Sequence, residues 1–584
     1  MPVAEIKAAV EEMCTLQKHG GPDDEGIYIC AEHHLVLGHR RLSLIDLSSS
    51  GHQPMSYSNG RYQITYNGEL YNYRELKQVL QKAGVPFTTS SDTEVILAAF
   101  ATWGTAAFNQ FSGMFAFAIW DMLTGELYLV RDPAGIKPLY FAHTTQGLAF
   151  ASEVRAFKAV NYLQTPHPQW QVYLMAYGHL PEPITTLKEV KPLAKGSFFR
   201  YNVFTGAIQQ EAFGRFNFVE LIDNRQQAIE LIRNRLAEGV KKHLLSDAPI
   251  GVFLSGGLDS SIIARLAGNE KKDLTTVSLI FNEQQYSEQR FQDIVQRDLC
   301  GDRYQKVLTE EAFHRDLPVI FEAMDLPSCD GINTWFISKY AREAGLKAVL
   351  SGVGGDELFG GYPSFNRIGP ALQLQQQVAA GLLRKSWYAG FKKFKRLCYL
   401  SIKSTAGMYL FLRGQFIPQQ IAAYLDADEA NIWSILEQEP ILPVIDNLTA
   451  KNQASWMELN LYMQNQLLRD ADVMSMAHGL EIRLPFLDSA FLKLALQLSS
   501  DVKYSGLKNK QLLVDSFKDI IPREVWNRPK MGFSLPFADW LARDQYAQTK
   551  FGSKSAIYHQ QFVAGKLHWS QFLTVFLIEN QANA

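Results

Sequence analysis

Alternating hydrophobic and polar positions dominate the first 160 residues. Short apolar or alternating runs are separated by Gly, Asn and Asp, which are typical of turns. These runs are GIYICA (26–31), HLVLGH (34–39), YQITYNG (62–68), MFAFAIWD (114–121), GELYLVRD (125–132) and GLAFASE (147–153). Residues 71–83 and 92–103 instead carry apolar residues at helical spacing. The pattern predicts an α+β N-terminal domain over residues 1–210, with antiparallel sheets sandwiched with helices.

The pattern changes at Gln226, where apolar residues begin to recur at intervals of three and four along one helix face. Strands then alternate with helices: PIGVFL (249–254), a helix from Ser260, LTTVSLIF (274–281), a helix through Ile294, a helix from Asn333 and KAVLSG (347–352). This rhythm predicts an α/β doubly wound parallel sheet over residues 225–584. Residues 365–480 are expected to be almost wholly helical additions. Sheets of this kind bind ligands at the carboxyl ends of their strands.

Composition narrows the class of function. The chain has 584 residues, too many for one hydrophobic core, with 57 basic and 59 acidic side chains. This balance offers no general attraction to nucleic acid or an anionic membrane, so small-molecule substrates are expected. No apolar run reaches the roughly 18 residues of a membrane span, which predicts a cytoplasmic protein. The five cysteines form no CxxC pair and indicate neither a disulfide framework nor a zinc site.

A serine–glycine segment, Ser255-Gly256-Gly257-Leu258-Asp259-Ser260, follows the expected buried strand at 250–254 and opens the next helix. Bare backbone N–H groups at the positive end of a helix bind phosphate oxygens. Asp259 offers an oxygen ligand to Mg²⁺, and Ser255 and Ser260 offer hydroxyl donors. Taken alone, the segment fits a serine-capped helix after a glycine turn equally well.

A second glycine-rich loop follows another expected strand, in KAVLSGVGGDELFGGY (347–362). Its acidic pair is Asp356 and Glu357. If both loops meet in one crevice, Asp259 and Asp356 can hold Mg²⁺ between them and neutralise the charge on a leaving pyrophosphate. The sequence contains neither the Walker pattern GxxxxGK[ST] nor a dinucleotide-binding GxGxxG helix start. The two loops therefore predict an ATP-using enzyme of another type.

Further motifs extend this pattern over nearly the whole chain. The C-terminal ones are FLSGGLDSS (253–261), MDLPSCDGINT (324–334), LSGVGGDELFGGYPSF (350–365), LLRDADVMSMAHGLEIRLPFLD (467–488) and RPKMGF (528–533). The N-terminal ones are GPDDEG (21–26), HRRLSLIDL (39–47), NGELYNY (67–73), SSDTEV (90–95), GMFAFAIWD (113–121) and RDPAGIKPLY (131–140). With these motifs the chain resembles the glutamine-dependent asparagine synthetase family.

The resemblance implies a class II glutamine amidotransferase domain that releases ammonia from glutamine, and an ATP-pyrophosphatase-type synthetase domain. In the synthetase domain, ATP and aspartate give β-aspartyl-AMP and pyrophosphate. Ammonia then attacks the activated carbonyl and releases asparagine and AMP. The implied cofactors are ATP and Mg²⁺, the implied partners are small molecules, and a homodimer is a possible assembly.

The resemblance also assigns residues. The expected ATP contacts are Leu254, Leu279, Ser351 and Gly352 around the adenosine and Ser255, Gly256, Gly257, Asp259 and Ser260 around the pyrophosphate. Asp259 and Asp356 are the expected Mg²⁺ ligands. Lys510, in LKNKQLL (507–513), is expected to meet the phosphates and stabilise their charge. Its alternative is a solvated surface lysine.

In the N-terminal domain the resemblance assigns glutamine binding to Arg41, Asn67, Gly68, Glu69 and Asp92. Arg41 suits the α-carboxylate, Asp92 and Glu69 the α-ammonium group, and Asn67 with Gly68 an oxyanion hole. Without the resemblance, the Asn-Gly pair predicts only a hairpin turn.

The chain departs from the family pattern at three positions. The family's glutaminase nucleophile is a cysteine at residue 1, but this chain starts Met1-Pro2 and has no such nucleophile; Cys14 lies inside an expected helix without an amine to activate it. Gly20 stands at an arginine position. Either the sequence starts inside a longer natural chain, which the full glutamine shell favours, or the protein uses free ammonia.

Val353 is the third departure, because it stands where well-known asparagine synthetases have a glutamate that helps the attacking amine. Aspartate is the expected acceptor. The alternatives are an amide- or lactam-forming ligase of the same fold acting on another carboxylate, and a non-catalytic regulatory or binding protein on this scaffold.

Overall fold

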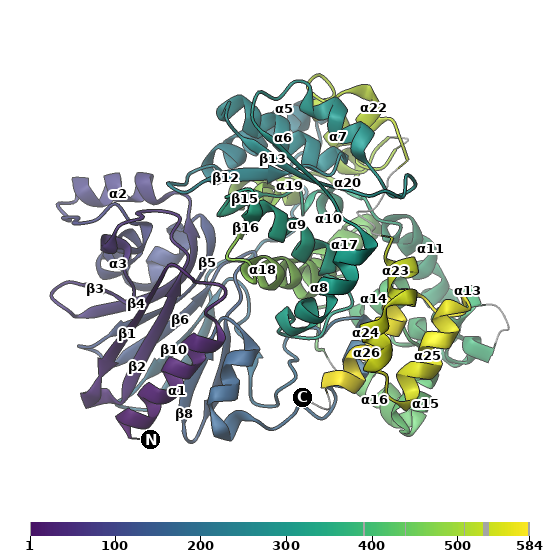
Figure 1. Cartoon of the computed structure of the whole chain (residues 1–584), viewed down its shortest axis with the longest axis horizontal. Helices are drawn as coiled ribbons and strands as arrows, with labels where there is room; N and C mark the ends of the chain where they lie inside the picture. Colours follow the sequence, from purple (N-terminus) through teal and green to yellow (C-terminus); the bar gives the residue numbers. More distant parts are fainter. Residues whose placement is uncertain (1, 389–391, 439, 507, 530–535, 582–584) are drawn as a thin grey trace.

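The computed structural model describes residues 2–388, 392–438, 440–506, 508–529 and 536–581 (Figure 1). Met1 and the greater part of the RPKMGF motif, from residue 530, lie outside the described residues. The N-terminal half, on the left of Figure 1, contains the strands β1 (Asp24–Cys30), β2 (Leu35–Arg41), β3 (Met55–Tyr57), β4 (Tyr62–Leu70), β5 (Gly113–Asp121), β6 (Glu126–Arg131), β7 (Tyr140–Thr144), β8 (Gly147–Ala151), β9 (Lys191–Pro192), β10 (Ser197–Asn202) and β11 (Ile208–Ala212). Its helices are α1 (Val3–Leu16), α2 (Tyr73–Lys82), α3 (Asp92–Trp103) and α4 (Trp170–Tyr177).

The N-terminal half is built in layers. Six antiparallel strands form one sheet in the order β11-β10-β6-β5-β4-β3, and β1-β2 and β8-β7-β9 form two smaller antiparallel sheets. Alternate residues of β5 explain the stacking: Phe115, Phe117 and Ile119 share one core with α3, whereas Ala116 and Ala118 share another with β2. Because both faces of β5 are covered, nearly the whole strand is apolar. Helix α1 covers the outer side of β2.

The second half is organised around five parallel strands in the order β14-β13-β12-β15-β16. They are β12 (Ile250–Phe253), β13 (Thr275–Ile280), β14 (Arg303–Val307), β15 (Ala348–Leu350) and β16 (Glu481–Arg483). The chain runs outward from β12 through β13 to β14 and then returns to the other side of β12 with β15. The ends of β12 and β15 therefore flank the topological switch point, where such sheets bind ligands. The predicted fold class is confirmed in both halves.

Helices cover both faces of this sheet. In Figure 1, α5 (Arg225–His243), α6 (Leu258–Glu270) and α7 (Gln289–Gln296) lie above the strands, and α9 (Ile332–Glu343), α10 (Gly355–Phe359) and α18 (Leu468–Met476) lie below them. Helix α5 starts at the cap Asn224, whose side chain accepts from Gln227 N, and buries Ile232, Leu236 and Val240. Its periodic apolar face is the one predicted from the sequence.

The remaining helices pack beside the sheet. They are α8 (Glu310–Ala323), α11 (Ser364–Gln377), α12 (Ala380–Arg384), α13 (Lys392–Lys395), α14 (Thr405–Arg413), α15 (Pro418–Leu425), α16 (Glu429–Gln438), α17 (Ala450–Met457), α19 (Ser489–Gln497), α20 (Ser500–Lys503), α21 (Gln511–Phe517), α22 (Arg523–Trp526), α23 (Phe537–Arg543), α24 (Gln545–Thr549), α25 (Ser553–Val563) and α26 (Trp569–Gln581). Between α17 and α18 the helix winds as a π-helix, η8 (Glu458–Leu467). In the described ranges no helix is long and apolar enough to cross a membrane.

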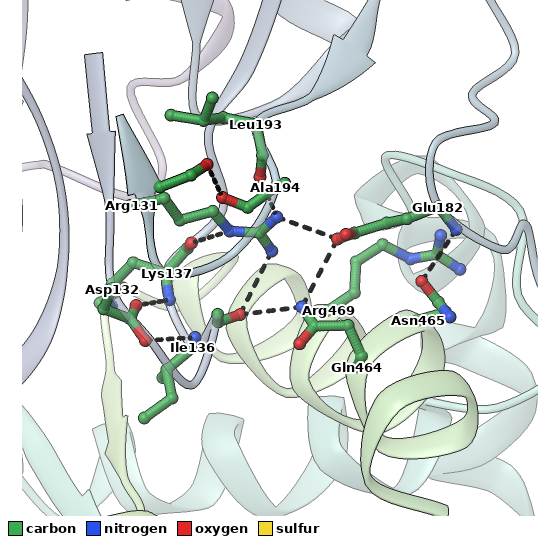
Figure 2. A network of polar contacts seen from close by, with 12 residues as sticks. Arg131, Asp132, Ile136, Lys137, Glu182, Leu193, Ala194, Gln464, Asn465 and Arg469 are labelled. Carbon is green, nitrogen blue, oxygen red and sulfur yellow. Dashed lines mark hydrogen bonds and ion pairs between the residues drawn. The ribbon is translucent and has the colours of Figure 1, made fainter. Parts of the chain in front are cut away.

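The two halves are joined by polar contacts along η8 (Figure 2). Arg131 donates from Nη1 to Glu182 Oε1 at 2.9 Å and from Nε to the Lys137 carbonyl at 2.9 Å. Gln464 of η8 donates to the Gly135 carbonyl at 3.1 Å, and Asn465 accepts from Glu182 N at 3.0 Å. Long π-helices are rare and are frequently found at functional sites. Here the π-helix holds the 131–137 loop against the second half.

Candidate active site

The serine–glycine segment forms a closed turn between β12 and α6. Ser255 Oγ lies 2.9 Å from Ser260 Oγ, and Gly257 N donates to Ser255 Oγ at 3.3 Å. Helix α6 starts at Leu258, directly after the turn. The segment borders a cavity of about 880 Å³, which is also bordered by Leu254, Leu279, Ser351 and Gly352. The predicted ATP contacts are thus brought together, with one exception.

Gly256 is the exception, because it does not border this cavity. It has a φ of +80°, and a Cβ there would lie 3.0 Å from Phe291 Cβ and 3.1 Å from Gln292 N, both on α7. Its carbonyl accepts from Arg528 at 2.9 Å. The glycine is therefore required by the turn and by close packing on α7. Of the two glycines predicted to approach a phosphate, Gly257 borders the cavity and Gly256 does not.

The second glycine-rich loop approaches the first one closely. A Cβ on Gly352 would lie 2.8 Å from Ser260 N, and a Cβ on Gly355 would lie 2.6 Å from the Asp259 carboxyl carbon. Such distances are shorter than side chains tolerate, so these two positions need glycine for backbone contact. The close approach places Asp356, on the first turn of α10, beside Asp259.

Lys510 lies between these two carboxylates. Its ammonium group forms ion pairs with Asp259 and with Asp356, and the residue is only 8% exposed. The alternative of a solvated surface lysine is therefore wrong. Burial alone would lower the pKa of Lys510, but the two carboxylates outweigh it and raise the pKa well above its ordinary value. Lys510 also has a φ of +57°, a backbone strain that marks functional sites in many proteins.

The donor set suits Mg²⁺. Two carboxylates converge on one cationic group beside the serine–glycine turn, and Mg²⁺ is commonly held by one or two carboxylates together with phosphate oxygens. Asp259 and Asp356 are the residues that would hold the ion. Among the described residues, no cluster of three or more His, Cys, Asp or Glu side chains offers a dedicated metal cage.

Val353 and Glu357 border the same cavity beyond Asp356. Glu357 Oε1 accepts from the Tyr362 hydroxyl at 2.7 Å, and Oε2 accepts from Gly354 N at 3.1 Å. Burial, reinforced by the neighbouring Asp356, raises the pKa of Glu357 to about 7. A carboxyl group with such a pKa can accept a proton near neutral pH, a task that Val353 cannot perform.

A second cavity, of about 480 Å³, lies in the N-terminal half and is bordered by all five predicted glutamine-binding residues, Arg41, Asn67, Gly68, Glu69 and Asp92. The Arg41 guanidinium donates to the carbonyls of Ser48 at 3.1 Å and Ile45 at 3.2 Å. One Asp92 oxygen accepts from the Tyr66 hydroxyl and from Leu70 N, both at 3.0 Å. These contacts fix a cationic group and an anionic group at the same cavity.

Asn67 and Gly68 are not a hairpin turn. They lie inside β4, opposite Ala116 and Phe115 of β5. Gly68 has a φ of +145°, and a Cβ there would lie 2.1 Å from the Met114 carbonyl oxygen. Asn67 Nδ2 donates to Ser152 Oγ at 3.3 Å. The Asn-Gly pair thus serves strand packing at the edge of the cavity.

The N-terminal cavity runs between two strand edges. It is bordered by every residue of β2 and of β8. In the sheets formed by the described residues, β2 pairs with β1 alone and β8 with β7 alone. Helix α1 contributes Cys14 to the lining. Burial raises the pKa of this thiol to about 11, so it is protonated at neutral pH and is a poor nucleophile.

A thin wall separates the two cavities, and its residues are not among the site residues predicted from the sequence. In β16, Glu481 borders the N-terminal cavity, and Ile482 borders the cavity of about 880 Å³, called the ATP-side cavity after the ATP contacts predicted there. In α18, Asp472 borders the first and Asp470 the second. Strand and helix periodicities thus direct neighbouring side chains to opposite cavities. The segment was recognised only as part of the motif at 467–488, and the cluster of charged residues there was the available signal.

Buried ion pairs connect this wall to the N-terminal half. Arg483 Nη2 lies 3.0 Å from Glu69 Oε1, and Arg483 Nε donates to Glu481 Oε1 at 2.9 Å. Lys137 Nζ lies 3.0 Å from Asp472 Oδ1. Removing one partner of such a pair typically costs about 3–5 kcal/mol, because the other charge stays buried. The relative placement of the two halves is therefore strongly specified.

Comparison with known proteins gives a consistent picture. A family model described as asparagine synthase matches residues 231–563, and one described as a glutamine amidotransferase domain matches residues 2–213. Asparagine synthetase (glutamine-hydrolyzing) 1 of Bacillus subtilis is 32% identical over 564 residues, which cover 93% of this chain and 86% of the relative. Asparagine synthetase (glutamine-hydrolyzing) 3 of the same organism is 26% identical, covering 90% and 83%. Amidase chry2 of Gibberella zeae is 28% identical, covering 92% and 86%. The chain belongs to the asparagine synthase family and carries a glutamine amidotransferase domain.

Proposed function

We propose that the protein activates the side-chain carboxylate of aspartate with ATP and amidates it to asparagine, releasing AMP and pyrophosphate. One observation carries the proposal: the loops after β12 and β15 meet at the switch point of the parallel sheet, with Lys510 held between Asp259 and Asp356. This arrangement brings one cation and two carboxylates together beside the serine–glycine turn at the start of α6.

The first step joins an aspartate carboxylate oxygen to the α-phosphorus of ATP and breaks the bond to pyrophosphate. Gly257 N and the hydroxyls of Ser255 and Ser260 bind the departing pyrophosphate oxygens. Lys510 stays protonated and stabilises the negative charge that develops on them. Mg²⁺, when bound by Asp259 and Asp356, adds further charge neutralisation there.

In the second step ammonia attacks the acyl carbon of β-aspartyl-AMP, and AMP leaves with its electron pair. The attacking nitrogen must lose a proton, and Glu357 is the proposed acceptor because its pKa of about 7 matches neutral pH. The apolar side chain of Val353 leaves this task to another group.

The nitrogen source follows from the N-terminal cavity. The five residues predicted to bind glutamine border this cavity, and Cys14 is the one thiol among the described residues that border it. Since the Cys14 thiol is protonated at neutral pH, Cys14 is not the proposed glutaminase nucleophile. The proposed nitrogen donor is ammonia, derived from glutamine or supplied free.

Product analysis tests the proposal. The protein is incubated with ATP, Mg²⁺ and aspartate, with ammonia or glutamine in parallel, and Asp356→Asn serves as the impaired variant. We expect asparagine, AMP and pyrophosphate in equal amounts with ammonia. Formation of ADP, or AMP release that does not depend on any carboxylate, contradicts the proposed chemistry.

A second candidate is an amide-forming ligase that activates another carboxylate. Val353 favours it, as it changes the acceptor side of the cavity relative to the expected glutamate. An ATP–pyrophosphate exchange screen over carboxylates separates the two. Exchange that requires another carboxylate and is not supported by aspartate would select the second candidate.

A further inference from the structure

Arg483 contacts both sides of the wall. Its side chain contacts Glu69, which borders the N-terminal cavity, and its backbone contacts the loop that follows β15. Its guanidinium pairs with Glu69 at 3.0 Å, and its carbonyl accepts from Ser351 N at 2.9 Å. Ser351 follows β15 directly and borders the ATP-side cavity. Arg483, which is fully buried, therefore connects a residue that borders one cavity with a residue that borders the other.

One carboxylate oxygen of Glu69 has no hydrogen-bond partner among the described residues in the absence of a ligand. The residue is 4% exposed, and its Oε1 faces Arg483, whereas its Oε2 is buried without a hydrogen-bond partner. Glu69 borders the N-terminal cavity. A buried carboxylate oxygen without a partner is unfavourable, and an ammonium group in the cavity would satisfy it.

The guanidinium is also tied to its own half. Arg483 Nε donates to Glu481 at 2.9 Å, and Nη1 donates to the His243 carbonyl at 2.9 Å. Leu350 is the register partner of Arg483 in the parallel pair β15-β16. A change in the position of Arg483 is therefore passed to β15 and to the first residue of the loop that follows it.

We propose that Arg483 is a positioning residue that couples binding of an α-amino acid in the N-terminal cavity to binding of ATP in the second cavity. The inference rests on the proposed function for the identity of both ligands. A ligand ammonium on Glu69 Oε2 fixes the Glu69 carboxylate, which in turn fixes Arg483 and the hydrogen bond from Ser351. ATP then binds a loop that is already ordered, so the coupling is positive.

The test measures binding and needs no turnover. L-glutamate is the probe for the N-terminal cavity, because it has the α-ammonium and α-carboxylate groups of glutamine but donates no nitrogen. Calorimetry gives the Kd of ATP with Mg²⁺ in the absence of glutamate and at saturating glutamate. We expect glutamate to lower the ATP Kd about fivefold, and ATP to lower the glutamate Kd by the same factor, because linkage is reciprocal.

Two variants and a matched control assign the coupling to Arg483. Arg483→Met is expected to bring the coupling factor to one, and Arg483→Lys to retain part of it, since lysine keeps the charge but not the fork of donors. Lys347→Met is the control. It removes the ion pair between Lys347 and Asp23, 2.7 Å apart, which also joins the halves but borders neither cavity. The control should keep the fivefold coupling.

The outcomes separate the two proposals. If ATP does not bind the wild-type protein, the proposed function is wrong. If ATP binds but glutamate does not, or if both bind independently, the coupling is wrong and the proposed function stands. Because the wild-type measurement alone decides this, the inference stays testable even if Arg483→Met does not fold. Coupling that persists in a folded Arg483→Met protein also overturns the role of Arg483.

Discussion

Replacing Lys510 with methionine removes the cation between Asp259 and Asp356 while keeping an unbranched side chain of similar length. Both carboxylates then remain buried without their shared partner. Without divalent cations, the free energy of unfolding should fall by about 3–5 kcal/mol, the typical cost of breaking a buried ion pair from one side. The rate of AMP formation should fall about 10²–10³-fold, because one charge that stabilises the leaving pyrophosphate is lost.

The effect of Mg²⁺ on the melting temperature gives a second, more specific prediction for Lys510→Met. If Asp259 and Asp356 hold Mg²⁺ as proposed, Lys510 competes with the ion in the wild-type protein, whereas in Lys510→Met the ion is the one counter-charge of the two carboxylates. The rise in melting temperature on adding Mg²⁺ should therefore be larger for the variant; binding at 100 times the Kd contributes about 2.7 kcal/mol. Thermal unfolding with chelator or Mg²⁺ measures it. Lys518→Met, at an exposed ion pair, is the matched control and should respond like the wild type. If Mg²⁺ does not stabilise Lys510→Met more than the control, Asp259 and Asp356 do not form a metal site.

Three further substitutions test the rest of the site. The folded pKa of Glu357, about 7, lies above the ordinary 4.5, so its contribution to stability is present below pH 4.5 and is lost as the pH rises through about 7. The melting temperature of Glu357→Gln relative to wild type should therefore rise between pH 5 and 8, and a difference independent of pH would contradict the raised pKa. Gly361→Ala places a Cβ 1.8 Å from Asp356 Oδ1, so calorimetry should show ATP binding with Mg²⁺ weakened about tenfold or more; unchanged affinity would exclude Asp356 from the site. Val353→Glu should increase the rate of amide formation with aspartate; if it abolishes activity with every acceptor in a product assay, the idea of a missing base is wrong.

The local pattern of the sequence was sufficient to predict the layers of the fold. Helix α3 begins at Asp92 and ends at Trp103 as expected, because Ser91 caps it and its apolar residues face β3 and β4. Strand β16 was missed. Its three residues come directly after the stretch expected to be helical, and only their pairing with β15 makes them a strand. Such a short element has no periodic signal of its own.

The two glycine-rich loops of the candidate site were predictable from the sequence. The contacts that these loops make with distant parts of the chain were not. The burial of Lys510 depends on Asp259, 251 residues earlier in the chain, so a motif of seven residues could not distinguish it from a surface lysine. The packing of Gly256 against Phe291 was not predictable either, because Phe291 lies on a different helix. The wall between the cavities is a long-range feature in the same sense, because Glu69 and Arg483 meet only in the folded chain.

The pleat of β16 limits how this protein can be recombined with its relatives. Glu481, Ile482 and Arg483 face the N-terminal cavity, the ATP-side cavity and Glu69 in turn, so no cut in the chain assigns this strand to one activity. A chimera that exchanges only the amidotransferase half would bring a foreign partner to Arg483 and leave a buried charge unmatched. Grafts that carry the strand together with the N-terminal half are the ones expected to keep both chambers intact.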